Sequence, residues 1–491
     1  VSGYTNPRES GHDFFTIGHT STSVSLACGL AKARDLKGGH ENIIAVIGDG
    51  SLSGGEAYEG LSNAGEMGTN LIIVVNDNEM SIAENHGGLY QNLKELRDTE
   101  GRSSCNFFRS LGLDYLYVGE GNDIPSLVAA FAKVKDTSRP TVVHIHTQKG
   151  KGYAPAEADR EEFHWEMPFD LETGKPKVDC SGMEDYHSLT GKFLLEKMKE
   201  DHTVVAISSG TPTVIGFTPE RRKQAGRQFV DVGIAEEHAV ALASGIAAGG
   251  GRPVYGVYST FIQRCYDQLS QDLCINGNPA VITVFMGTVA GMNDVTHLGF
   301  FDIPLISNIP NMVYLAPTCS EEYFAMLEWA VRQTEYPVAI RVPGVAVVHR
   351  KEEFDTDYSE LNRYKMTARG ETVAILALGS FYDLGQALKN KLREESGVEA
   401  TLINPRYITG LDEPMLEELK VGHRIVVTLE DGVLDGGFGE KIARYYGNSE
   451  MRVLNYGLRK EFADRYNLDE LMKANRLTDK QMAEDIAGIL E

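Results

Sequence analysis

Short apolar runs rich in Val and Ile recur along the chain, and longer amphipathic stretches separate them. This alternation is typical of parallel strands covered by helices, because a strand buried on both faces reads as a continuous apolar run. The pattern therefore predicts an α/β protein with mainly parallel sheets. Strands are expected over 42–47, 70–75 and 141–145, then 204–207, 229–232, 254–258, 281–285 and 338–341, and finally 372–378, 400–403, 424–429 and 452–454. Helices are expected over 55–66 and 384–394.

Two polar stretches, 170–185 and 350–362, separate these groups of strands. The first contains Gly174, Pro176 and Gly182 and the second is rich in charge, which is typical of surface connections between domains. We therefore expect three consecutive α/β domains over residues 1–175, 183–350 and 363–491. The length of 491 residues agrees, because a single core seldom organises so long a chain.

The net charge of the chain limits the classes of molecule that it is expected to bind. A net charge of -23 argues against nucleic acid and anionic membranes, so small-molecule substrates are expected. No apolar run is long enough to cross a bilayer, and the six cysteines are scattered without zinc-ligand spacing. These features predict a cytoplasmic protein with reduced, mostly buried thiols.

Two polar motifs directly follow two of the expected strands. Gly48-Asp49-Gly50-Ser51 follows the strand at 42–47, and Asn76-Asp77-Asn78-Glu79-Met80 follows the strand at 70–75. In open α/β sheets, ligands bind at the carboxyl ends of the strands. Glycines allow close backbone approach, and the helix expected from residue 55 points its amides at the same place.

Oxygen ligands from Asp49 and Asn78 suit a hard cation, so the two motifs favour a magnesium-bridged diphosphate site. A dinucleotide site is a weaker alternative, with Gly48, Gly50 and Gly54 as the glycine pattern and Asp77 as the ribose-binding acid. An aspartate between the first two glycines fits a pyrophosphate poorly unless a cation intervenes. A plain structural turn is a third reading.

Motifs along almost the whole chain resemble the 1-deoxy-D-xylulose-5-phosphate synthase family of the transketolase superfamily in order and spacing. They are Gly18-His19-Thr20-Ser21-Thr22-Ser23, Gly48-Asp49-Gly50, Asn76-Asp77-Asn78-Glu79-Met80-Ser81-Ile82, Lys149-Gly150-Lys151-Gly152-Tyr153, Phe163-His164, Ala235-Glu236-Glu237-His238-Ala239-Val240 and Tyr258-Ser259-Thr260-Phe261-Ile262-Gln263-Arg264. The resemblance implies a transketolase-like fold and thiamine diphosphate with Mg²⁺ as cofactors. It also implies that elements precede Val1 in the family, so the first domain is expected to be N-terminally incomplete.

The same resemblance assigns residues to the cofactor. Asp49, Asn78 and the carbonyl of Met80 would hold magnesium. The residues expected to line the cofactor are Gly18, His19, Thr20, Gly50, Ser51, Asn78, Tyr153 and Glu236. Glu236 would be the activating acid, because a carboxyl group hydrogen-bonded to the aminopyrimidine favours the tautomer that accepts the thiazolium proton. Without the resemblance, Glu236 reads as an acid stabilised at a helix N-terminus.

Further residues are implied on the substrate side. His297, His164 and Arg264 would position substrate or assist proton transfer, and Tyr258, Arg341 and Asp294 would bind it. A lone histidine is more often structural, so these roles rest on the resemblance.

The sequence departs from the family in the stretch from Phe285 to His297. Counting back from His297, Met286 stands where the family has an arginine and Asn293 where it has an aspartate, and the acid is displaced to Asp294. Methionine offers no charge to the phosphate of an acceptor, which leaves Arg341 as the retained arginine.

The expected reaction is decarboxylation of pyruvate and transfer of the remaining two carbons to an aldehyde, with glyceraldehyde 3-phosphate as the expected acceptor. The family also implies a homodimer and a part in isoprene and thiamine biosynthesis. Alternatives are transketolase-type ketol transfer, the decarboxylating component of a 2-oxo acid dehydrogenase, a non-catalytic cofactor-binding relative, and a dinucleotide-dependent oxidoreductase.

Overall fold

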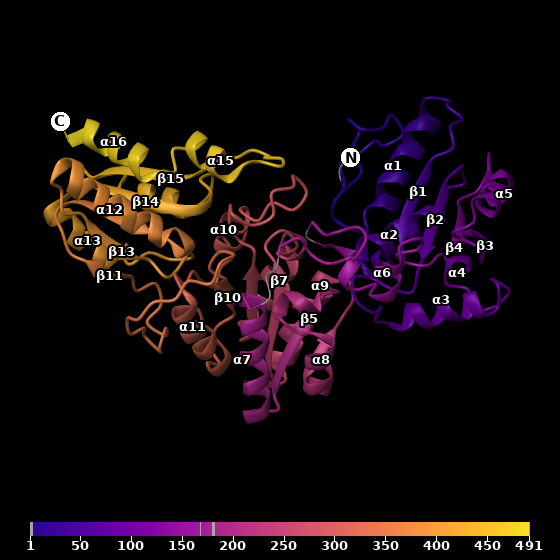
Figure 1. Ribbon diagram of the computed structural model, residues 1–491, viewed down its shortest axis with the longest axis horizontal. Helices are drawn as coiled ribbons and strands as arrows, with labels where there is room; N and C mark the ends of the chain where they lie inside the picture. The colour runs from indigo at the N-terminus through magenta and orange to yellow at the C-terminus, as the bar shows by residue number, and fades with distance from the viewer. Residues whose placement is uncertain (1–2, 167, 179–181, 491) are drawn as a thin grey trace. The chain divides into compact units, whose positions relative to one another are not determined.

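The computed structural model describes residues 3–166, 168–178 and 182–490, which form two compact units. The first unit comprises Val1–Met183, Ser209–Pro212 and Asp231–Glu236, and the second comprises Glu184–Ser208, Thr213–Val230 and Glu237–Glu491. Three sheets with covering helices make up these units (Figure 1), so the predicted α/β fold class is confirmed. Each sheet falls within one of the three expected domain ranges. The exact domain limits stay a prediction.

The sheet of the first unit has the order β1-β2-β4-β3 and parallel pairing throughout. Its strands are β1 (Ile44–Gly48), β2 (Ile72–Asp77), β3 (Asp114–Val118) and β4 (Thr141–His146). The helices are α1 (Ser23–Leu36), α2 (Gly55–Ala64), α3 (Gly88–Asp98), α4 (Phe107–Ser110), α5 (Ile124–Val134) and α6 (Ala154–Ala158). Apolar residues of α1, α2 and α3 share a core with alternate residues of β1 and β2, while α5 packs with the other face of β2 and β4.

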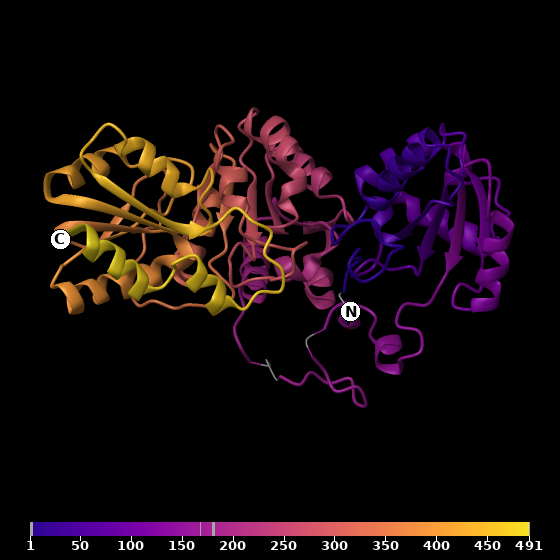
Figure 2. The ribbon, with the colours of Figure 1, turned by 90° about the horizontal axis from the view of Figure 1, so that it is seen from above.

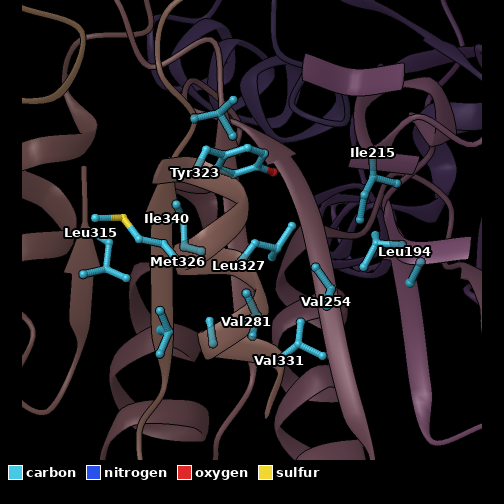
Figure 3. Packing of buried hydrophobic residues seen from close by; sticks show 14 of the residues in the cluster. Leu194, Ile215, Val254, Val281, Leu315, Tyr323, Met326, Leu327, Val331 and Ile340 are labelled. Atoms are coloured by element: carbon cyan, nitrogen blue, oxygen red, sulfur yellow. The ribbon is translucent and has the colours of Figure 1, made fainter. Parts of the chain in front are cut away.

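The second sheet has the order β6-β5-β7-β8-β10-β9. Its strands are β5 (Val204–Ser208), β6 (Phe229–Asp231), β7 (Arg252–Tyr258), β8 (Val281–Phe285), β9 (Val313–Leu315) and β10 (Val338–Arg341). The helices are α7 (Tyr186–Glu200), α8 (Pro219–Ala225), α9 (Glu236–Ala248), α10 (Asp302–Ser307) and α11 (Ser320–Arg332). Figure 3 shows Leu327 and Val331 of α11 beside Val254 and Val281 of the strands, all buried. Burial of this helix face holds α11 on the sheet.

The third sheet has the order β11-β13-β12-β14-β15, and only β11 runs antiparallel to its neighbour. Its strands are β11 (Lys365–Ala368), β12 (Thr372–Ala377), β13 (Thr401–Asn404), β14 (His423–Val433) and β15 (Arg452–Leu458). The helices are α12 (Tyr382–Ser396), α13 (Glu413–Gly422), α14 (Phe438–Tyr446), α15 (Leu468–Ala474) and α16 (Asp479–Leu490). The C-terminal helix α16, yellow in Figures 1 and 2, shares a buried core with α12 and the sheet.

The expected strands and helices are all present, with ends that differ by a few residues. Three strands were missed: β3, β9 and β11 are short or carry polar residues, so they lack a continuous apolar run. Strand β14 extends to Val433 instead of ending at Leu429, because Val433 regains its pairing with Leu458 after an irregularity. Part of the expected connection over 170–185, with Cys180, lies outside the described residues; of the other five cysteines, all but Cys105 are buried.

Candidate functional site

The two polar motifs of the first unit meet at the carboxyl ends of β1 and β2. Gly48 pairs with Asn76 in the parallel ladder, and the N–H of Asp49 donates to the carbonyl of Asn76 at 3.1 Å. The Asp49 carboxylate is 1% exposed and accepts from Asn85 Nδ2 at 2.7 Å. The backbone N–H of Asn78 also donates to this carboxylate. The structure therefore brings Asp49 and Asn78 together, as the strand pattern predicted.

Burial and the nearby charge of Asp77 raise the pKa of Asp49 above its ordinary value. Asp77 itself is fully buried and accepts from Arg97 Nη1 at 2.5 Å, and His144 Nε2 lies 2.8 Å away. These partners lower the pKa of Asp77 against the effect of burial. The Asp77 carboxylate is thus buried and already bound to Arg97 and His144. It is not placed to bind a ribose, as the acid of a dinucleotide site would.

The turn after β2 is conformationally strained. Glu79 has φ 67°, a left-handed conformation that is uncommon outside glycine, and Asn78 Oδ1 accepts from the N–H of Met80 at 3.2 Å. Lys149 Nζ donates to the carbonyl of Ser81 at 2.6 Å and so holds the turn from the side. The assignment of the Met80 carbonyl as a metal ligand stays a prediction.

Gly50 is required by close packing, since a Cβ atom there would lie 2.8 Å from Cβ of Ser81. The following residue, Ser51, accepts at its carbonyl from Ser21 Oγ at 2.8 Å. This bond ties the Gly48–Ser51 motif to the loop that carries Gly18, His19 and Thr20 just before α1.

Tyr153 lies at the start of α6, where its ring packs edge-on against Phe163 and its hydroxyl donates to the carbonyl of Leu171 at 3.1 Å. His164 follows Phe163 in an exposed turn. The cofactor and substrate roles of Tyr153 and His164 stay predictions.

Glu236 belongs to the first unit although helix α9, which it begins, belongs to the second. The turn before it is hydrogen-bonded to the turn after β1: the N–H of Ile234 donates to Ser53 Oγ at 2.9 Å, and Ser53 Oγ donates to the carbonyl of Gly50 at 2.8 Å. Glu236 is 3% exposed. The predicted activating acid and the predicted diphosphate loop are therefore parts of one compact unit.

The other predicted substrate residues lie in the second unit. His297 is 8% exposed, and burial lowers its pKa despite the opposing charge of Asp294. Tyr258 ends β7 and packs edge-on against His187, while Arg264 lies in the turn that follows. Their roles stay predictions.

Arg341 is buried at the end of β10. Its Nε donates to Asp302 Oδ2 at 2.8 Å, and its Nη2 donates to Asp302 Oδ1 at 3.2 Å and to the carbonyl of Asp431 at 2.6 Å. Tyr314 donates a further hydrogen bond to Asp302. Sequence reasoning missed Asp302 and Asp431, and no local motif marks them; their role depends on packing between the second and third sheets.

The chain matches three family models. They describe 1-deoxy-D-xylulose-5-phosphate synthase over residues 1–105, the transketolase pyrimidine binding domain over 184–347 and the transketolase C-terminal domain over 363–482. The 1-deoxy-D-xylulose-5-phosphate synthase of Clostridium beijerinckii is 35% identical, and the alignment covers 97% of this chain and 82% of that protein. The enzyme of the same name from Clostridium tetani is also 35% identical, with coverage of 100% and 84%.

Solved structures show the same fold. A transketolase mutant from Pichia stipitis in complex with xylulose 5-phosphate is 16% identical, with a TM-score of 0.51 and coverage of 95% of this chain and 79% of that one. A split-gene transketolase, described as an inactive β4 tetramer, has a TM-score of 0.52 and 20% identity, covering 62% of this chain and 98% of its own. The protein is a transferase with the transketolase fold, in the thiamine-diphosphate-dependent class that the motifs predicted. The chain belongs to the 1-deoxy-D-xylulose-5-phosphate synthase family.

Within the described residues, no helix has the length and apolar character needed to cross a bilayer. Over the same part of the chain, no group of three His, Cys, Asp or Glu side chains is arranged as a metal site. The three predicted magnesium ligands would not form such a group, because only Asp49 is one of these residue types; Asn78 offers an amide oxygen and Met80 a backbone carbonyl.

Proposed function

We propose that this chain condenses pyruvate with an aldehyde, expected to be glyceraldehyde 3-phosphate, to give 1-deoxy-D-xylulose 5-phosphate and carbon dioxide. The curated relatives that align with nearly the whole chain carry the name of this activity. In the reaction, the bond between C1 and C2 of pyruvate breaks, C2 forms a bond to the aldehyde carbon, and the aldehyde oxygen takes up a proton. A cytoplasmic homodimer and a part in isoprene and thiamine biosynthesis belong to the same proposal.

The observation that carries the proposal is the meeting of Asp49 and Asn78 at two adjacent strand ends. Asp49, Asn78 and the carbonyl of Met80 would hold Mg²⁺, with phosphate oxygens completing its preferred oxygen shell. The residues present fit a cation. The Asp49 carboxylate is buried, and burial together with the charge of Asp77 raises its pKa; a bound cation would favour the ionised form of this carboxylate.

Unused oxygen atoms nearby support the same fit. Among the described residues, Asn85 Oδ1 and Ser81 Oγ are buried without a hydrogen-bond partner. A buried polar atom left unsatisfied costs free energy, so such atoms commonly mark the place of a ligand or an ordered water. Asn85 also holds Asp49 directly, through its other side-chain atom.

The remaining residues divide into two tasks. Gly18, His19, Thr20, Gly50, Ser51 and Tyr153 would line thiamine diphosphate, which supplies a carbon nucleophile and an electron sink when bound. Glu236 would hold a proton on the aminopyrimidine, where its burial strengthens the hydrogen bond. His164, His297, Arg264, Tyr258, Arg341 and Asp294 would contact pyruvate or the acceptor.

The first test removes the metal ligand. Asp49→Ala should abolish measurable binding of thiamine diphosphate in the presence of Mg²⁺, followed by titration calorimetry, because a neutral loop cannot hold a metal diphosphate. Asp98→Ala is the matched control, since Asp98 is an exposed partner of Lys94 on α3. Undiminished affinity in Asp49→Ala would reject the site.

The second test identifies the reaction. Mass spectrometry should find 1-deoxy-D-xylulose 5-phosphate, with one carbon dioxide released per molecule formed from pyruvate and glyceraldehyde 3-phosphate. Ketol transfer between sugar phosphates without release of carbon dioxide would favour the transketolase alternative instead.

A further inference from the structure

Residues 286–300, which we term the His297 loop, leave the second sheet after β8 and pack into the core of the third. Val289, Leu298 and Phe300 are each 3% exposed or less and belong to the apolar cluster formed by the third sheet with α12 and α16. The loop that carries His297 is therefore anchored in the C-terminal domain, even though its flanking elements β8 and α10 belong to the domain before it.

Backbone groups of the loop are held by the C-terminal domain as well. The N–H of Val289 donates to Asp431 Oδ1 at 2.7 Å, and the hydroxyl of Tyr466 donates to the carbonyl of Val289 at 2.7 Å. The N–H of Val433 donates to the carbonyl of Phe300 at 3.1 Å. Both ends of the loop are thus fixed to the third sheet and to the segment that follows β15.

That segment, residues 464–466, also holds the middle of the loop. The N–H of Arg465 donates to the carbonyl of Asn293 at 2.6 Å, and Asn293 Nδ2 donates to the carbonyl of Tyr466 at 3.2 Å. The N–H of Val295 donates to Asp464 Oδ1 at 3.3 Å. Arg465 has φ 48°, so its backbone takes an uncommon left-handed conformation where it meets the loop.

Within the loop, the contacts continue to the histidine. Asp294 Oδ1 accepts from the N–H of Thr296 at 2.9 Å and from its Oγ1 at 2.6 Å. Thr296 Oγ1 lies 2.8 Å from His297 Nδ1. Residues 293–295, which residues 464–466 hold by hydrogen bonds, are therefore connected to the His297 imidazole through two contacts. These are Asp294 to Thr296 Oγ1 and Thr296 Oγ1 to His297 Nδ1.

We propose that residues 464–466 position His297 for the reaction, with Tyr466 and Asp464 as positioning residues that act through the loop and touch no substrate themselves. This inference rests on the proposed function, because it takes His297 as a substrate-side residue. It gives the C-terminal domain an indirect part in the reaction, through the position of His297, although its residues lie far in sequence from every cofactor motif.

The test compares Tyr466→Phe with a matched control, Tyr445→Phe. Both variants lose one tyrosine hydroxyl from the C-terminal domain, but Tyr445 donates to Glu417 and not to the loop. Hydrogen exchange is followed by mass spectrometry in the cofactor-free protein. Loss of one hydrogen bond should speed exchange in peptides covering residues 287–297 roughly threefold to tenfold in Tyr466→Phe only.

The second readout is catalytic. Tyr466→Phe should lower kcat/KM for the acceptor about tenfold, mainly through kcat, while calorimetry finds the affinity for thiamine diphosphate and Mg²⁺ unchanged. Asp464→Ala should act in the same direction, and Asp464→Asn should restore much of the rate because its amide oxygen still accepts from Val295.

Unchanged exchange in Tyr466→Phe would overturn the inference, and so would faster exchange with an unaltered kcat/KM. Equal effects in Tyr445→Phe would also overturn it, since they would reflect general loosening of the domain. Measurements on the parent protein test the proposed function separately. If the parent binds no thiamine diphosphate and releases no carbon dioxide from pyruvate, the proposed function is wrong, whatever the variants show.

Discussion

Replacement of Met286 by arginine tests how the chain recognises the phosphate of its acceptor. Met286 directly follows β8 and is partly buried, with φ 55°. The substitution adds a guanidinium where the family resemblance expects one, and it creates no new backbone requirement because methionine already adopts the left-handed conformation. The other expected arginine, Arg341, has Nε and Nη2 engaged by Asp302 and the Asp431 carbonyl.

The magnitude follows from these contacts. A charge-assisted hydrogen bond contributes about 1.5 to 3 kcal/mol, and 1.4 kcal/mol corresponds to a factor of ten. The parent should therefore show only weak preference for a phosphorylated aldehyde, since Met286 has no charge and Asp302 balances Arg341. Met286→Arg should raise that preference roughly tenfold to a hundredfold.

The assay measures kcat/KM for glyceraldehyde 3-phosphate and for glyceraldehyde in the parent and in Met286→Arg. Ile275→Arg is the control: it adds the same charge at a residue that is 68% exposed, and so reports the general effect of charge on a protein of net charge -23. A parent that already discriminates strongly, together with no change in Met286→Arg, would refute the placement of the phosphate beside Met286.

Glu236→Gln should leave thiamine diphosphate bound but slow exchange of its C2 proton, followed by NMR after acid quench, by roughly 10²- to 10⁴-fold; exchange at the parent rate would exclude Glu236. Asn85→Ala should weaken Mg²⁺-dependent cofactor binding about tenfold in calorimetry, because the hydrogen bond that orients Asp49 is lost. Asp302→Ala should destabilise the second unit by about 3 to 5 kcal/mol, seen as a lower Tm, since it removes the carboxylate that pairs with the buried guanidinium of Arg341. Burial raises the pKa of Glu430 to about 7. Its protonated form therefore favours folding, and the stability of the parent relative to Glu430→Gln should fall by roughly 3 kcal/mol as pH rises from about 4.5 to 7 in thermal melts.

The local sequence was sufficient to predict the strands and helices whose apolar residues follow a regular pattern. Continuous apolar runs marked the central strands, such as β2 and β8, because strands buried on both faces need apolar residues throughout. The polar motifs after β1 and β2 were then placed at one sheet edge, since parallel neighbours end on the same side. Asp49 and Asn78 could be paired on that basis alone.

Only the tertiary structure decided which residues support these motifs. Asn85 contacts Asp49 from the loop between β2 and α3, and Arg97 and His144 contact Asp77 from a helix and another strand. No sequence spacing predicts these contacts. Periodicity describes which face of an element is buried, but it does not say which distant side chain meets that face.

The same limit applies to the His297 loop. Its apolar residues Val289 and Leu298 read as part of the second domain, yet they complete the core of the third. The hydrogen-bond partners of Val289, Asp431 and Tyr466, lie more than a hundred residues further along the chain. Apolar surfaces that fit together are stabilised by burial whatever their separation in sequence. The surfaces of the loop and the third sheet fit together only once both sheets have formed.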